Sequence, residues 1–146
     1  MPGRVEAIRI APEHEQLPEP VDSVDVTAEG LTGDRYLGRG DITLVETEAL
    51  EAFHEETGIA LSHAEIRRQV LTSGIQLNDL LHKRFRVGGV EAVGMEWCEP
   101  CNHIQGLTYP GVLRGMVHRA GLRADIVQAG RIAVGDEVGE VRDAAA

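Results

Sequence analysis

Aromatic residues, lysine and cysteine are all scarce in this chain of 146 residues. Two Phe, two Tyr and one Trp are its whole aromatic content, and it has two cysteines. So few aromatic side chains leave no obvious stacking platform for single-stranded nucleic acid. The formal net charge of −10 points the same way, because a protein that binds nucleic acid needs a basic surface to neutralise phosphates. The composition therefore argues against nucleic acid as a partner.

Long apolar runs are missing as well. No stretch approaches the ~20 apolar residues of a membrane span, and the N-terminus, Met-Pro-Gly-Arg, lacks the apolar region of a secretory signal. We therefore expect a cytoplasmic protein without a membrane partner. A reducing compartment makes a structural disulfide improbable, which leaves metal binding, redox exchange or a reactive thiol for the two cysteines.

What is present is the composition of one globular domain. Hydrophobic residues make up 42% of the chain and charged residues 26%, which is typical of a folded protein. The length predicts a single domain over residues 1–146, large enough to bury one ordinary core.

Short apolar segments separated by glycine and proline predict a strand-rich fold. The predicted strands cover residues 5–10, 21–26, 42–45, 68–72, 85–87, 90–95, 122–127, 131–134 and 137–141. Three short helices are predicted: one capped by Thr47, one from a capping box at 62–65, and one from Pro110, with a further helical turn at 77–81. Because strands and helices do not alternate regularly, an antiparallel or mixed barrel fits better than a doubly wound sheet.

Cys98 and Cys101, separated by Glu-Pro, are the first candidates for chemistry. A redox dithiol would prefer a βαβ setting, which the strand-rich pattern does not offer. A zinc site needs four ligands, and His103 and His118 would have to complete it at a spacing that matches no familiar zinc module. Zinc, a redox dithiol and buried inert thiols stay open beside a thiolate that ligates a soft metal or carries sulfur.

Arginine outnumbers lysine by thirteen to one. Genomic base composition would explain this, but the planar guanidinium also binds anions such as phosphate bidentately. Three arginine pairs lie at predicted element ends beside glycine: Arg35 and Arg39, Arg67 and Arg68, and Arg119 and Arg123. Glycine loops add backbone N–H donors that favour anions, so these pairs predict phosphate binding. Solvated surface arginines are the alternative.

The histidines divide into two groups. We expect His103 and His118 to be possible ligands or proton donors, because His103 follows the cysteines closely and His118 precedes Arg119. Surface positions are predicted for His14, His54, His63 and His82. No Ser/His/Asp arrangement, Walker loop or spaced carboxylate pair is present.

Four segments, taken in order and spacing, resemble a MOSC domain, the C-terminal domain of molybdenum cofactor sulfurases. They are residues 30–35 (Gly-Leu-Thr-Gly-Asp-Arg), 67–75 (Arg-Arg-Gln-Val-Leu-Thr-Ser-Gly-Ile), 98–101 (Cys-Glu-Pro-Cys) and 117–123 (Val-His-Arg-Ala-Gly-Leu-Arg). The resemblance covers roughly residues 3–139. It implies a β-rich α/β fold with a β-barrel core and a few short peripheral helices.

The resemblance also implies the molybdenum cofactor, molybdopterin, as the bound group. The cysteine that carries sulfur or ligates molybdenum in the family matches Cys101, which becomes the implied catalytic residue and metal ligand. Arg67 and Arg68 match the family's basic pair, plausible partners of the pterin phosphate. The implied cofactor-binding set is Arg35, Arg67, Arg68, His118 and Arg119. Two departures matter: Gln69 stands where the family often has Asn, and Tyr36 where it often has His, which puts specific contacts at both positions in doubt.

Three functions follow from this resemblance. The first is a cofactor-binding or sulfur-carrying module, with a persulfide or molybdenum on Cys101. The second is a molybdenum-dependent reductase of N-hydroxylated compounds, and the third is a metal-independent binding domain with structural cysteines. Sulfurases pair their MOSC domain with a pyridoxal-phosphate lyase domain, and some relatives carry a ferredoxin domain. This chain is too short for a lyase domain and has two of the four cysteines that a ferredoxin cluster needs. We therefore expect a separate cysteine desulfurase or sulfurase, a molybdoenzyme or an electron donor as partner. Whether the chain is itself an enzyme stays open.

Overall fold

The computed structural model describes residues 2–13, 17–98, 116 and 119–141. The strands are β1 (Gly3–Ile10), β2 (Glu19–Val21), β3 (Ser23–Thr27), β4 (Gly30–Leu31), β5 (Asp41–Glu46), β6 (Val70–Ser73), β7 (Arg84–Val87), β8 (Val90–Trp97), β9 (Leu122–Gln128), β10 (Gly130–Ala133) and β11 (Glu137–Glu140). The helices are α1 (Thr47–Thr57), α2 (His63–Ile66) and the 3₁₀ helix η1 (Leu77–Leu80). Among the residues described, no helix has the length and apolar character needed to span a membrane.

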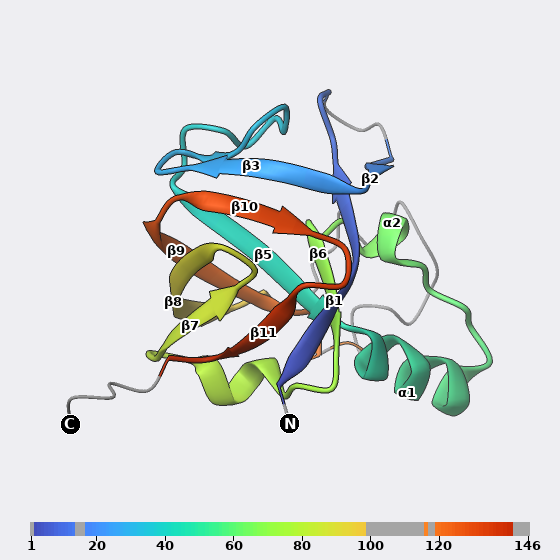
Figure 1. The fold of residues 1–146 in the computed structure, drawn as a ribbon. Coiled ribbons are helices and arrows are strands. Elements are labelled where there is room, and N and C mark those ends of the chain that lie inside the picture. The colour runs from blue at the N-terminus through green and yellow to red at the C-terminus, as the bar shows by residue number, and fades with distance from the viewer. Residues whose placement is uncertain (1, 14–16, 99–115, 117–118, 142–146) are drawn as a thin grey trace.

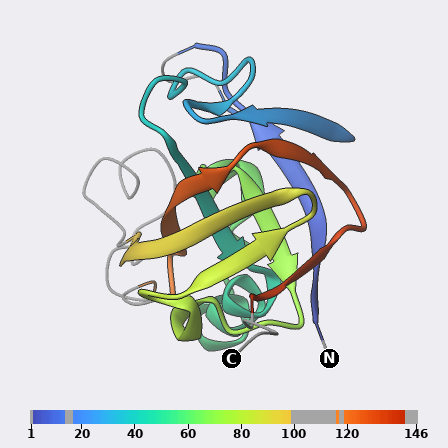
Figure 2. The ribbon, with the colours of Figure 1, turned by 60° about the vertical axis from the view of Figure 1, so that its left-hand side comes forward.

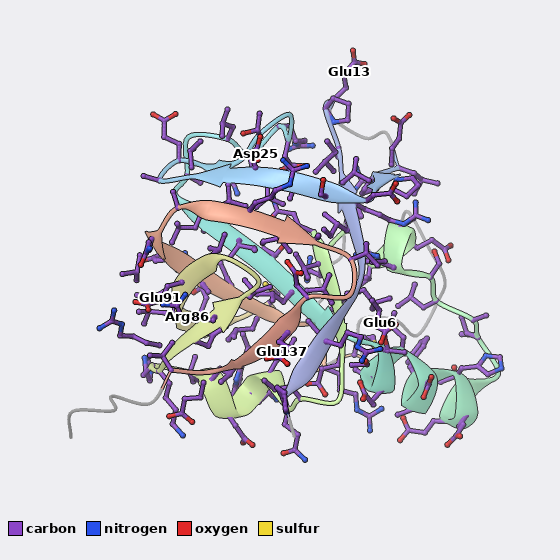
Figure 3. The ribbon with its side chains drawn as sticks, viewed as in Figure 1. Glu6, Glu13, Asp25, Arg86, Glu91 and Glu137 are labelled. Carbon is purple, nitrogen blue, oxygen red and sulfur yellow. The ribbon has the colours of Figure 1, made fainter. Side chains whose placement is uncertain are left out.

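Within the described part of the chain, seven strands close into a barrel. Their order is β11-β7-β8-β9-β5-β6-β1, and β1 pairs back onto β11 through Gly3↔Val138 and Arg4↔Glu137. The β5–β6 pair is parallel and the other barrel pairs are antiparallel, so the barrel is mixed. The short strand β2 adds to the outer edge of β1. Cross-strand charges support the hairpin, as where Arg86 of β7 and Glu91 of β8 stand 3.9 Å apart (Figure 3).

A second, three-stranded sheet in the order β10-β3-β4 lies across one end of the barrel, as Figures 1 and 2 show. The main core fills the barrel and the space under this sheet. It is built by residues that alternate along the strands, such as Val24 and Val26 of β3 and Phe85 and Val87 of β7. This alternation is the same pattern that predicts the strands from the sequence.

A second core lies between α1, α2 and the strands β5 and β6. Its buried members are Val45, Phe53, Leu61, Ile66, Met116 and Ala120. The α1 helix supplies Phe53, while Val45 of β5 belongs to the barrel wall, so the second core joins the helices to the barrel. Its last two members stand at the return of the chain from the segment that carries Cys101.

The fold class predicted from the sequence is confirmed: a strand-rich barrel with a few short helices. The capping box of α2 is present, with Ser62 and Glu65 each bonded to the other's backbone N–H. The α1 helix ends at Gly58 in the left-handed conformation, at φ 76°. The glycine-linked hairpin is formed by β7 and β8.

Three boundary predictions differ from the structure. The N-cap of α1 is Glu46 rather than Thr47, whose buried hydroxyl has no hydrogen-bond partner among the described residues. The segment predicted as one strand at 21–26 is divided between β2 and β3, and β6 begins at Val70 rather than Arg68. The helix predicted from Pro110 lies outside the described residues.

Candidate functional site

Polar side chains gather on the outer face of the barrel where β5, β9 and β8 lie side by side. Thr43 of β5 stands opposite Arg123 of β9, and Arg123 stands opposite Glu96 of β8. The residues that alternate with them, Leu44 and Leu122, are buried in the barrel core. The strand period therefore sends the apolar side chains inward and the charged ones to this face.

Arg123 is the centre of this charged face. Its guanidinium contacts three carboxylates: Asp41 at 3.6 Å, Glu96 at 2.9 Å and Asp125 at 3.0 Å. Burial raises the pKa of Asp41 above its ordinary value, and Arg123 and Arg39 oppose that rise. Arg123 is thus committed to neighbouring carboxylates, while Asp41 is a carboxyl group in a partly desolvated position.

Cys98 follows β8 directly, at the edge of the same face. Its backbone N–H donates to the carbonyl of Gly121 at 2.8 Å, and its side chain is half-buried and not in a disulfide. Burial raises the pKa of the Cys98 thiol, and the nearby Arg68 guanidinium only partly offsets this. At neutral pH, Cys98 is therefore a protonated and weakly nucleophilic thiol.

Arg68 joins the two ends of the segment that carries the second cysteine. Its Nε donates to the carbonyl of Ala120 at 2.7 Å, and its Nη2 donates to the carbonyl of Cys98 at 3.4 Å. Its Nη1 donates to the carbonyl of Ile66 at 3.3 Å. Three of the five guanidinium N–H groups are thus directed at backbone carbonyls rather than toward an anion.

Arg67 is the C-cap of α2 in the left-handed conformation, at φ 64°, and its N–H donates to the carbonyl of His63. Few non-glycine residues adopt this conformation, so surrounding contacts must stabilise it. One of them comes from His63, whose Nε2 lies 2.6 Å from the carbonyl oxygen of Arg68. A carbonyl only accepts, so Nε2 carries the proton and donates. The basic pair is therefore held by a histidine.

The prediction that His63 lies on the surface is wrong. Its exposed fraction is 8%, and burial lowers its pKa to about 4. Nδ1 is buried with no hydrogen-bond partner among the residues described. The sequence did contain a signal, because His63 and Ile66 are spaced i, i+3 and so share one face of α2. His54 and His82 are exposed as predicted, whereas His14 lies outside the described residues.

The glycine-rich loop of residues 30–40 is attached to the barrel by a buried amide–carboxylate network. Asp34 accepts from the N–H of Ala11 at 2.8 Å and from Nε2 of Gln69 at 2.9 Å. The other end of the Gln69 amide, Oε1, accepts from the N–H of Thr43 at 2.9 Å. Gln69 therefore bonds to protein at both ends of its amide, which agrees with the doubt about a cofactor contact there.

The remaining predicted residues are distributed unevenly. Arg35 lies in the same loop as Arg39, and their guanidinium carbons stand 4.4 and 4.2 Å from the centre of the Tyr36 ring. Arg119 donates to Glu56 of α1, with Nη2 and Oε1 at 3.0 Å. This ion pair connects the α1 helix to the chain just before β9. The four residues Cys101, His103, His118 and Pro110 lie outside the described part of the chain.

Two features were not predicted as site residues. Asp34 and Asp41 are buried carboxylates. Asp34 belongs to the segment 30–35 that carries the family resemblance, and Asp41 stands between a glycine and the apolar residues of β5. A separate groove beside α1 contains none of the predicted site residues; it is lined by Thr47, Leu50, Glu51, His54, Glu55, Ala60 and Leu61. Among the described residues, no three His, Cys, Asp or Glu side chains are placed to bind a metal ion.

The fold and this site define a small mixed β-barrel whose outer face brings Arg123, the buried carboxyl of Asp41 and the Cys98 thiol together. Residues 34–139 match the MOSC domain family, and the chain belongs to that family. The family predicted from the sequence segments is therefore confirmed, and it is a family associated with the molybdenum cofactor.

Solved structures with the same fold come from several bacteria. The YuaD protein from Bacillus subtilis is 17% identical with a TM-score of 0.84, covering 94% of both chains. YiiM from Geobacillus stearothermophilus is 14% identical with a TM-score of 0.77, covering 97% of this chain and 76% of its own. YiiM from Escherichia coli is 16% identical with a TM-score of 0.68, and the match covers 96% of this chain and 70% of the Escherichia coli chain. At these identities the likeness concerns the fold. A search of curated proteins found no significant match.

Proposed function

We propose that this MOSC-family protein binds the molybdenum cofactor, or carries sulfur for it, through Cys101. A separate protein would be its partner: a cysteine desulfurase or a molybdoenzyme. The observation that supports the proposal is the position of Arg68, which bonds to both Cys98 and Ala120. Cys101 follows Cys98 by three positions in the sequence, and three residues span at most about 11 Å of chain.

The residue types implied by the family resemblance, cysteine and arginine, fit the chemistry of a molybdenum–pterin group. Thiolate sulfur is a ligand that soft metals prefer, and guanidinium groups suit a phosphate. The two cysteines differ in role, because burial raises the pKa of Cys98 and keeps it protonated. We therefore assign the soft-ligand role to Cys101. Arg68 serves as a positioning residue, since its donors are used by backbone carbonyls.

Sulfur transfer to Cys101 would be a thiol–persulfide exchange, which needs no added oxidant. The Cys101 thiolate attacks the outer sulfur of a donor protein's persulfide, the donor's S–S bond breaks, and the donor leaves as a thiol after taking up a proton. The products are a Cys101 persulfide and the reduced donor. When bound, the molybdenum cofactor would supply oxygen-atom or sulfur chemistry at the metal. The chain's own residues would hold its phosphate and its metal.

The first test is elemental analysis of the protein from a host that makes molybdenum cofactor. Cys101→Ser is compared with Cys98→Ser, the matched control. Near-stoichiometric molybdenum that is lost only in Cys101→Ser supports the proposal. Zinc in place of molybdenum contradicts it and favours the zinc alternative with His103 and His118.

The second test covers the sulfur-carrying form. The metal-free protein is incubated with a cysteine desulfurase and cysteine, and intact mass is measured. A gain of one sulfur atom on wild type and Cys98→Ser, but not on Cys101→Ser, supports the carrier. Neither metal nor added sulfur in either test overturns the proposal. Turnover of an N-hydroxylated substrate with a supplied reductant would assign a reductase rather than a carrier.

A further inference from the structure

The groove beside α1 shares no residue with the charged face around Arg123. One wall is formed by Ala60 and Leu61, which follow the turn at Gly58 where the helix ends. The other wall is one face of the helix, at positions i, i+3, i+4, i+7 and i+8. That face runs for about 12 Å, or two turns. Its residues are Thr47, Leu50, Glu51, His54 and Glu55.

The deeper part of the groove is apolar. Leu61 is only 4% exposed and belongs to the second core, and the half-buried Leu50 packs against the same core. The volume of the groove is about 370 Å³, which is near the lower end of the roughly 300–1,000 Å³ found for ligand pockets. The groove therefore suits one or two apolar side chains rather than a large cofactor.

The rim of the groove carries negative charge that the protein leaves without a partner. The α1 helix contains four glutamates and no lysine or arginine. Glu48 accepts from a backbone N–H, and Glu56 pairs with Arg119. The other two, Glu51 and Glu55, are exposed and form no hydrogen bond or ion pair with any described residue. Like charges at i and i+4 destabilise a helix, so cations from another molecule would relieve this repulsion.

We propose that this groove is a docking site for a basic amphipathic helix of a partner protein. A helix lying along α1 has side chains at i and i+4 that are about 6 Å apart, so two of its basic residues can stand opposite Glu51 and Glu55. An apolar side chain on the same face then enters the groove over Leu50, as in other helix-in-groove complexes. The net charge of −10 attracts such a partner over a distance. This surface goes beyond the proposed function and does not involve the cysteines.

The first experiment identifies what the groove binds. A displayed library of helical peptides about 20 residues long, randomised on one face, is selected on the full chain; this length is enough for helix formation. The enriched peptides should carry Leu, Ile or Phe with Lys or Arg one turn away. Affinity of the best peptide is measured by fluorescence anisotropy. Replacing its apolar anchor with alanine should weaken binding about tenfold or more, because the buried apolar area is lost.

The second experiment locates the peptide on the protein. The double variant Glu51→Gln, Glu55→Gln should bind the best peptide about fivefold more weakly, and the difference should shrink as salt is raised. The matched control is Glu29→Gln, Glu137→Gln, which removes two charges from exposed positions between β3 and β4 and on β11. The strand β3 and the helix α1 lie at opposite ends of the molecule (Figure 1). The control should stay within about twofold of wild type, because it changes only the net charge.

Four results overturn the proposal. One is that no peptide is enriched over a selection without the protein. Another is that the enriched peptides lack basic residues. The third is that the two double variants, both folded by circular dichroism, bind the best peptide equally. The fourth is a wild-type dimer in sedimentation velocity that dissociates in Glu51→Gln, Glu55→Gln, which would assign the groove to a second copy of the chain. The molybdenum and sulfur tests do not use this surface, so the two proposals fail separately.

Discussion

Gln69 shows how one buried amide can determine the position of a whole loop. Its Nε2 donates to Asp34 at 2.9 Å and its Oε1 accepts from the N–H of Thr43 at 2.9 Å. The residues it links come from the loop at 30–40 and from β5. A buried carboxylate that loses its hydrogen-bond donor stays out of water without a partner. Breaking one of these hydrogen bonds therefore costs more free energy than breaking an exposed one.

Gln69→Ala should therefore lower the free energy of unfolding by about 2–3 kcal/mol, the expected effect of leaving buried partners unsatisfied. Gln76→Ala changes an exposed glutamine and should stay within about 0.5 kcal/mol of wild type. Urea unfolding measures both. Equal values for the two variants would mean that the network does not fix the loop.

The two thiols should differ in reactivity, and each can be measured alone. In Cys101→Ser, the remaining Cys98 should alkylate slowly near neutral pH, with a midpoint above the ordinary thiol pKa of about 8.5, because burial raises its pKa. In Cys98→Ser, fast labelling of Cys101 near neutral pH is expected if arginines surround it. Iodoacetamide rates measured across pH test both. A Cys98 midpoint below its ordinary value would contradict the assignment of roles, and slow labelling of Cys101 would count against both molybdenum functions.

At the scale of elements, much of the fold could be predicted from the sequence. Local rules sufficed for the capping box at Ser62, the left-handed Gly58 after α1, and the hairpin around residues 88–89. They failed where tertiary contacts decide. The pairing of Asp34 with Gln69 joins residues 35 positions apart, and Arg68 donates to the carbonyl of Ala120, which is 52 positions away. No local pattern contains such long-range partners.

His63 of the short helix α2 should make the free energy of unfolding depend on pH. Its pKa is about 4 in the folded protein against an ordinary 6.5. As pH falls, the unfolded chain takes up the proton near 6.5 while the folded protein resists until about 4. The stabilisation is therefore complete above about pH 6.5 and is lost between 6.5 and 4, by up to about 3 kcal/mol.

His63→Gln keeps a donor for the carbonyl of Arg68 and removes the titration. The difference in unfolding free energy between wild type and this variant should change with pH only within that window. For the control His54→Gln, at an exposed site, the unfolding free energy should change with pH as it does in wild type. Urea unfolding at pH 4.5, 5.5 and 7 measures the slopes, and parallel curves for His63→Gln would contradict the burial of a neutral ring.

Gly121 is the position where two strands leave no room for a side chain. Its φ is +118°, and a Cβ there would stand 2.1 Å from the carbonyl oxygen of Leu44 on β5. Gly38 has a similar φ of +113°, but a Cβ there would meet no atom within 4 Å. An alanine at Gly38 therefore measures the backbone strain alone, without a steric clash. Gly38→Ala should cost about 1 kcal/mol and Gly121→Ala at least about 2 kcal/mol more. Equal shifts in the denaturation midpoint would show that β5 and β9 can separate freely.

At the scale of the molecule, the described residues form two hydrophobic cores with different relations to the site. The barrel core, which includes Phe85, lies inside the closed strands. The second core, which includes Phe53, contains Met116 and Ala120, the described residues at the return of the cysteine-bearing segment. Arg68 and the Glu56–Arg119 pair bond to the same return. Packing in the second core should therefore govern the site while the barrel core governs overall stability.

Phe53→Leu and Phe85→Leu separate these two effects, because both side chains are fully buried. Each should lower the free energy of unfolding by about 1–2 kcal/mol through lost contacts and a small cavity. Only Phe53→Leu should also change the alkylation rate of Cys101, measured in a Cys98→Ser background, and reduce the molybdenum or sulfur that the protein retains. Both variants remain folded at such a cost, so reactivity can be compared in the native state. An equal change in Cys101 reactivity in Phe85→Leu would mean that the barrel itself, rather than the second core, holds the cysteine in place.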